Sequence, residues 1–229
     1  PELSTRYFSA DGKTELWIPD LISLTSISYS EDDGATYTAL ASSNYYLTVG
    51  SDFNSPKSYT QFVLSKNGTL SIFPAGQRSV KIVGVWGYTD DRDRSWENSQ
   101  DTVEDNPLSS SATVVTVNDA DGLDLDGAKY RLQRGNLIRV ESEYLEIRNL
   151  KYGQNTLTVS RARNGSTAAS HVQNTQIDVW RVPSPVKESV ILLSIEFLER
   201  GFFQFNEQSK ELKPSELRSD RSISFSSRL

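Results

Sequence analysis

The sequence predicts a mainly β protein: a β-sandwich or barrel-like domain, an inserted small β-barrel-like module, and one C-terminal amphipathic α-helix with an extended tail. Up to about residue 182, short runs of alternating apolar and polar residues are separated by turn residues, as expected for antiparallel strands. After Pro185 the apolar period changes to that of a helix, and from residue 204 no period remains. A length of 229 residues is enough for one or two domains.

The first predicted domain covers residues 1–88. Thr14–Ile18 and Leu24–Tyr29 alternate in polarity, and Val80–Trp86 resembles a strand buried on at least one face. Asn67-Gly68 separates the candidate strands 61–64 and 69–73. This dipeptide favours a type I′ hairpin turn, because both central residues of that turn need a positive φ. These strands at this spacing predict a β-domain.

Two further segments precede the helix. Residues 89–111 carry seven carboxylates opposed by only two arginines, so we expect an exposed acidic linker that cannot bury itself. Trp96 lies in this segment and is predicted either to anchor an interface or to join a local cluster. Residues 112–182 return to short strands punctuated by glycines and by Asn164-Gly165, which predicts the inserted β-module.

Ser184-Pro185 has the residue types that begin helices, and Gly201 is the expected end. We therefore predict a helix within residues 183–203 that packs on the first domain or on a neighbouring subunit, and an interaction tail over residues 204–229. A single amphipathic helix needs a partner surface to be stable. The candidate interaction residues in the helix and the tail are Val186, Val190, Leu193, Phe197, Leu217, Ile223, Phe225 and Leu229.

Composition limits the possible functions. A net charge of −6 disfavours a groove that grips nucleic-acid phosphates. The chain has no cysteine and one histidine, His171, which excludes thiol catalysis, cysteine-ligated zinc and paired-histidine metal motifs. Apolar runs are too short for a transmembrane helix. We expect no enzyme activity, no cofactor, no metal and no membrane association.

Several residues invite sharper interpretations. His171 without a partner histidine favours a structural role over catalysis. Glu141, Glu143 and Glu146 could serve a hydrolase, although charges on one strand face are usually solvated. The acidic run 118–127 lacks the spacing of a calcium loop and favours a turn-rich connection. The last candidates form a possible sugar-stacking platform, although strand-borne aromatic residues more often pack in a core: Trp17, Tyr45, Tyr46 and Tyr59.

The order of several motifs resembles that of head-to-tail connector (adaptor) proteins of tailed bacteriophages. The first-domain motifs are Thr5-Arg6-Tyr7-Phe8 with Asp11-Gly12, Glu15 to Leu21, Leu70 to Gly76 and Val83 to Tyr88. Asn164 to His171, with Val179-Trp180-Arg181, is similar to a segment of related phage neck proteins. The family's N-terminal helices have no counterpart here. Since the sequence begins with Pro1 and not Met, we expect them upstream.

The resemblance implies a structural virion protein in the phage neck, assembled in the host cytoplasm. It implies binding to the portal protein as a cyclic homo-oligomer, expected to be a dodecamer, and to tail or tail-completion proteins. Double-stranded DNA would pass through the lumen without sequence-specific binding, aided by negative charge. The alternative from a different class is a carbohydrate- or receptor-binding module of a tail fibre or baseplate.

Overall fold

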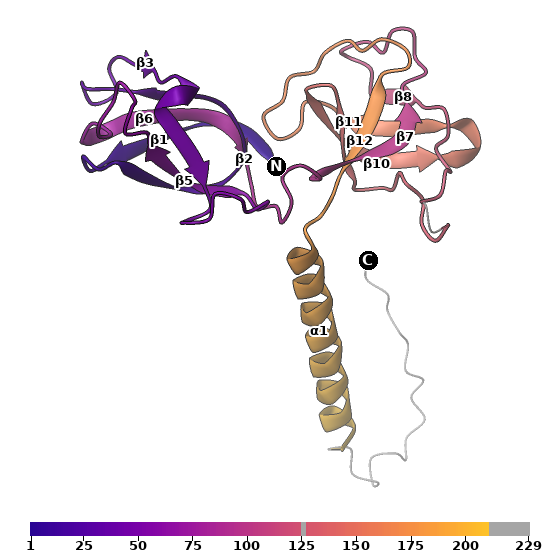
Figure 1. Ribbon diagram of the computed structural model, residues 1–229. Coiled ribbons are helices and arrows are strands. Elements are labelled where there is room, and N and C mark those ends of the chain that lie inside the picture. The colour runs from indigo at the N-terminus through magenta and orange to yellow at the C-terminus, as the bar shows by residue number, and fades with distance from the viewer. Residues whose placement is uncertain (125–126, 211–229) are drawn as a thin grey trace, which may run out of the picture. The chain divides into compact units, whose positions relative to one another are not determined.

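The computed structural model describes residues 1–124 and 127–210 (Figure 1), and their side chains up to residue 198. The protein is mainly β, with two antiparallel sheets and one C-terminal helix, which confirms the predicted fold class. The chain divides into two units, residues 1–183 and 184–229.

The first sheet holds β1 (Glu2–Ala10), β2 (Glu15–Tyr29), β3 (Thr38–Ala39), β4 (Tyr45–Thr48), β5 (Tyr59–Leu64) and β6 (Gly76–Trp86) in the order β1-β6-β2-β5-β4, with β3 paired to β2. A short 3₁₀ helix, Ser42–Asn44, precedes β4. β2 pairs with β5 up to Leu21 and with β6 from Leu21 onward. Apolar side chains that alternate along these strands form one core; its fully buried members include Leu21, Phe62, Phe73, Val80, Ile82 and Trp86.

The predicted hairpin around Asn67-Gly68 is wrong. Residues 61–64 lie in β5, but 69–73 form no strand, and neither Asn67 nor Gly68 has a positive φ. β5 is already paired on both sides, with β2 and β4, so no edge remains for a further strand. Asn44 Oδ1 instead accepts a hydrogen bond from the Thr69 backbone N–H at 2.6 Å.

The second sheet holds β7 (Trp96–Thr102), β8 (Val114–Thr116), β9 (Leu137–Val140), β10 (Glu143–Lys151), β11 (Thr156–Ser160) and β12 (Gln176–Trp180) in the order β7-β12-β9-β10-β11-β8. A 3₁₀ turn, Tyr152–Gln154, joins β10 to β11. This sheet has its own buried core, which includes Val103, Leu108, Ile138, Leu145, Ile147 and Ile177. The short strands predicted over residues 112–182 are therefore present as β8 to β12.

The structure corrects the expected acidic linker, because β7 lies inside residues 89–111 and pairs with β12. Ser99 and Asp101 of β7 are buried. The Asp101 carboxylate lies 3.3 Å from Arg131 Nε, and this ion pair offsets part of the cost of burying the charge. The second module thus begins at β7 and not at residue 112.

The helix α1 (Ser184–Lys210) begins where predicted and continues past Gly201, the expected end. A glycine inside a helix costs only about 1 kcal/mol relative to alanine, and the next proline is Pro214. Helical structure therefore continues into the predicted tail. Of the candidate tail residues, Leu217, Ile223, Phe225 and Leu229 lie outside the described residues.

Candidate interaction surfaces and a buried ionic cluster

Apolar side chains of α1 are exposed to solvent. The stripe predicted from the sequence has exposed fractions of 42% at Val186, 57% at Val190, 52% at Leu193 and 75% at Phe197. Their spacing of three and four residues places them on one face of the helix. A row of large apolar side chains on one face of a helix marks a surface that packs against another domain or another protein.

A second group of α1 side chains is as exposed as the first. Its members are Ile191, Leu192, Ile195 and Leu198, with exposed fractions between 46% and 73%. Ile191, Ile195 and Leu198 again recur at intervals of four and three residues, so they form a second face. Lys187 and Ser194 lie between the two faces on one side of the helix, and Ser189 and Glu196 lie between them on the other.

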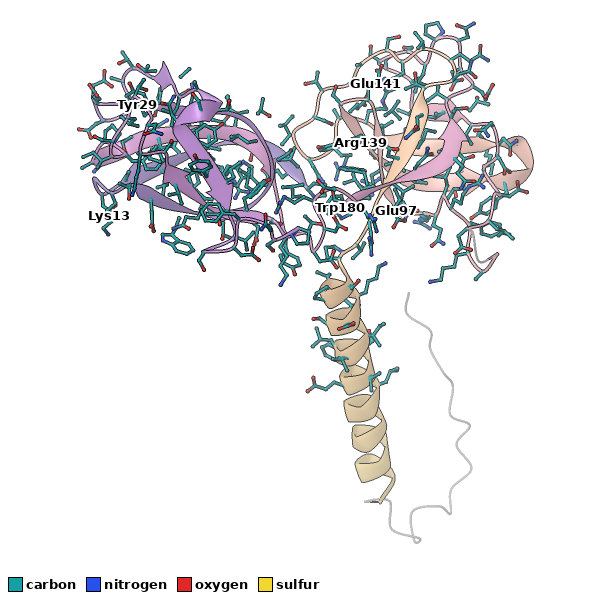
Figure 2. All side chains as sticks on the ribbon, in the orientation of Figure 1. Lys13, Tyr29, Glu97, Arg139, Glu141 and Trp180 are labelled. Carbon is teal, nitrogen blue, oxygen red and sulfur yellow. The ribbon has the colours of Figure 1, made fainter. Side chains whose placement is uncertain are left out.

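Trp96 belongs to a local aromatic cluster. Its ring stacks on Tyr144 with centroids 5.3 Å apart and meets Trp180 edge-on at the same distance. The Arg139 guanidinium lies 4.8 Å from the Trp96 ring centroid and 2.6 Å from Asp178. Arg139 and Trp180 come from the adjacent strands β9 and β12 (Figure 2). Of the two roles expected for Trp96, the contacts match the local cluster.

The glutamates considered for hydrolysis contribute to a buried ionic cluster. Glu143 is fully buried and Arg161 nearly so, and the guanidinium donates two hydrogen bonds of 2.6 Å to the Glu143 carboxylate. The expectation that Glu143 is solvated is therefore wrong. Its carboxylate also accepts hydrogen bonds from the backbone N–H groups of Ala162 and Ala169. With both oxygens occupied and buried, Glu143 acts as a structural clamp.

His171 completes the cluster. Its side chain is buried, with Nδ1 2.8 Å from a Glu141 oxygen and Nε2 2.9 Å from a Glu143 oxygen. Glu146, the third glutamate, pairs with Arg148 and Arg163 on the surface and does not reach the cluster. The contacts agree with a structural role for His171. The contacts of Glu143 with Arg161, Ala169 and His171 hold the segment after β11 against the start of β10.

The cluster changes the pKa of Glu143. Burial by itself would raise this pKa, but the hydrogen bonds from Arg161, the Ala169 backbone, His171 and the Ala162 backbone outweigh it and lower the pKa from 4.5 to about 2. A lowered pKa in the folded state stabilises the fold above the unfolded-state value, and this stabilisation is lost as the pH falls.

We therefore expect the free energy of unfolding to fall as the pH is lowered from about 4.5 to about 2. Urea unfolding at stepwise pH, with Glu143→Gln beside the wild type, measures this loss. Other carboxylates contribute to both proteins, so the difference between them isolates Glu143. If wild type and Glu143→Gln lost the same free energy of unfolding between pH 4.5 and 2, the ionised Glu143 carboxylate would not be stabilised by the contacts described above.

The described part of the acidic run 118–127 is a turn-rich connection. The Asp119 carboxylate accepts a hydrogen bond from Arg131 at 3.0 Å, and Asp124 Oδ1 accepts one from the Ala128 backbone N–H at 2.9 Å. Leu125 and Asp126 lie outside the described residues. Within the described part of the chain, no group of three or more histidine or acidic side chains could hold a metal ion.

The four aromatic residues considered as a sugar platform have different environments. Tyr45 and Tyr59 pack against the first core, whereas Trp17 and Tyr46 are exposed by 63% and 56%. Phe53, which the sequence analysis did not consider, is 57% exposed and meets Tyr46 edge-on with centroids 6.3 Å apart. Alternation along β2 was the available signal for Trp17, because Leu16 and Ile18 on either side are buried.

Comparison with known proteins gives no assignment: no protein-family model, no curated protein and no solved structure matches the chain. Across residues 1–124 and 127–210, no helix is both long and apolar enough to cross a membrane. The function must therefore be inferred from the surfaces described above.

Proposed function

We propose that the chain is a structural connector of a phage neck that joins the portal ring to tail or tail-completion proteins around the DNA channel. The observation that carries this proposal is the solvent exposure of the apolar residues of α1. Exposed apolar patches of this kind are covered in the assembled state, and a connector is a protein whose surfaces are buried by its neighbours.

The two faces of α1 specify how it is covered. A helix that is apolar on one face needs one partner surface, whereas a helix apolar on two faces lies between two. In a cyclic assembly, each subunit has a neighbour on either side and makes a heterologous contact with each. The Val186–Phe197 stripe and the Ile191–Leu198 face would meet two different surfaces, of the portal protein or of further copies of this chain.

The charge of the chain is compatible with a DNA conduit. The chain carries 30 acidic and 24 basic residues, and acidic surfaces repel phosphate. A lumen of this charge would let double-stranded DNA pass without specific binding. In this proposal the protein is a portal-bound homo-oligomeric ring in the virion, assembled in the host cytoplasm.

Replacing Leu193 by Glu is expected to abolish binding to the portal ring, because burying an unpaired carboxylate in an apolar contact costs several kcal/mol. Negative-stain images of portal rings mixed with the full chain measure occupancy. Ser194→Glu is the matched control: it adds the same charge one residue away, between the two apolar faces. Equal portal binding by wild type and Leu193→Glu would contradict the role of the helix.

A further inference from the structure

Trp17 has the largest exposed fraction among the tryptophan and tyrosine side chains of the described residues, at 63%. Leu16 and Ile18 on either side are buried in the first core, so the backbone that carries the indole is held by packing. Successive side chains of a strand point to opposite faces, and Trp17 therefore lies on the outer face of β2. An aromatic ring presented by a rigid strand is a preorganised stacking surface.

A polar hollow lies beside this ring. Its volume is about 360 Å³, and it is lined by Trp17 and by residues at the end of β1 and the start of β2: Ser9, Ala10, Asp11, Lys13, Glu15 and Leu16. Lys13 Nζ lies 2.5 Å from Asp11 Oδ2, and Glu15 accepts a hydrogen bond from Gln61 Nε2 at 2.8 Å. The side chains offer a hydroxyl, an ammonium and two carboxylates next to an aromatic face. Figure 2 labels Lys13 on the domain that holds the first sheet.

We propose that this hollow is a saccharide-binding site. A sugar ring has one face of C–H groups, which stacks on the electron-rich face of an indole, and a rim of hydroxyls. Each hydroxyl both donates and accepts hydrogen bonds, which suits a lining that holds carboxylate acceptors and an ammonium donor. Two carboxylates against one paired lysine disfavour an anionic ligand such as a nucleotide.

The surface beyond the hollow favours an oligosaccharide over a single sugar. Glu15 pairs with Val63 of β5, and Val63 pairs with Tyr46 of β4, so the Tyr46 side chain lies on the same outer face two strands away. Two strand spacings amount to about 10 Å. The Tyr46 and Phe53 rings therefore extend the platform that begins at Trp17.

A second copy of this chain is the competing occupant, since exposed aromatic residues also mark protein interfaces. The polar lining of the hollow favours the sugar, because the centres of protein interfaces are depleted of charged side chains. The experiment below separates the two occupants, and it is independent of whether α1 binds a portal.

The test is a screen of the full chain on an array of defined neutral and acidic oligosaccharides, followed by calorimetric titration with the best-bound member. Trp17→Ala should weaken that binding by about tenfold or more, because it removes the stacking surface. Tyr130→Ala is the matched control: it removes a 43% exposed ring of the second module that stacks on Tyr152. This control should bind as the wild type does.

Three results would overturn the inference. One is the absence of any bound oligosaccharide on the array with wild-type chain. Another is unchanged affinity in Trp17→Ala, provided that far-UV circular dichroism shows the same fold for the variant and the wild type. The third is loss of self-association in Trp17→Ala without a change in sugar binding, which would assign the surface to a second copy of the chain.

Discussion

Replacing Arg161 by Ala is expected to lower the free energy of unfolding by about 3–5 kcal/mol, because it leaves the fully buried Glu143 carboxylate without its charge partner. Arg161 also donates hydrogen bonds to the backbone oxygens of Ser109, Ala112 and Ala169. The substitution therefore also removes hydrogen bonds to two loops, the one between β7 and β8 and the one between β11 and β12. Urea unfolding of the full chain at neutral pH measures the change.

Arg148→Ala is the control for this prediction. The Arg148 guanidinium pairs with Glu146 at 2.7 Å, but its side chain is 51% exposed, and exposed ion pairs contribute about 0–1 kcal/mol. The two arginines belong to the same module, and they differ in burial and in the backbone hydrogen bonds that only Arg161 makes. A similar small loss in both variants would mean that Glu143 is solvated when Arg161 is absent.

Replacing Trp86 by Ala is expected to cost about 3–5 kcal/mol, because it removes a fully buried side chain from the first core. The Trp86 side chain is 1% exposed, packs against Phe8, and donates an indole hydrogen bond to the Ser4 backbone oxygen at 2.9 Å. The Arg6 guanidinium lies 4.5 Å from its ring centroid. The change therefore removes packing, a hydrogen bond and a cation–π contact together.

Trp17→Ala is the matched control, since it makes the same substitution at an exposed position of the same sheet. Surface substitutions away from special features change stability by about 0.5 kcal/mol or less. Thermal unfolding of both variants compares them directly. Comparable losses at the two positions would contradict the assignment of Trp86 to the core and Trp17 to the surface.

Local pattern was sufficient to predict most strands and the start of the helix. Alternation indicated short strands within residues 112–182, where β9, β10 and β11 lie, because each of these strands has one face in a core. Ser184-Pro185 marked the start of α1. The fold class follows from these signals, since strands at this spacing have few other ways to bury their apolar faces.

The errors arose where distant residues decide burial. The segment of β7 looked like a solvated linker, because the ion-pair partner of Asp101 is Arg131, 30 residues further along the chain. Glu143 looked solvated because its partner Arg161 lies 18 residues further along the chain. The hairpin predicted after β5 was wrong because β5 pairs instead with β4, and no local signal in the sequence indicates that pairing. Helical period did predict the α1 stripe, because that property is local.

The most direct test of the connector proposal is native mass spectrometry of the full chain, alone and mixed with the portal ring. We predict that mixing gives a closed complex carrying one copy of the chain for each portal subunit. Hydrogen exchange on the same samples should show that the amides of α1 gain protection in the complex. A chain that stays monomeric beside intact portal rings, with α1 exchanging at the same rate in both samples, would contradict the proposal.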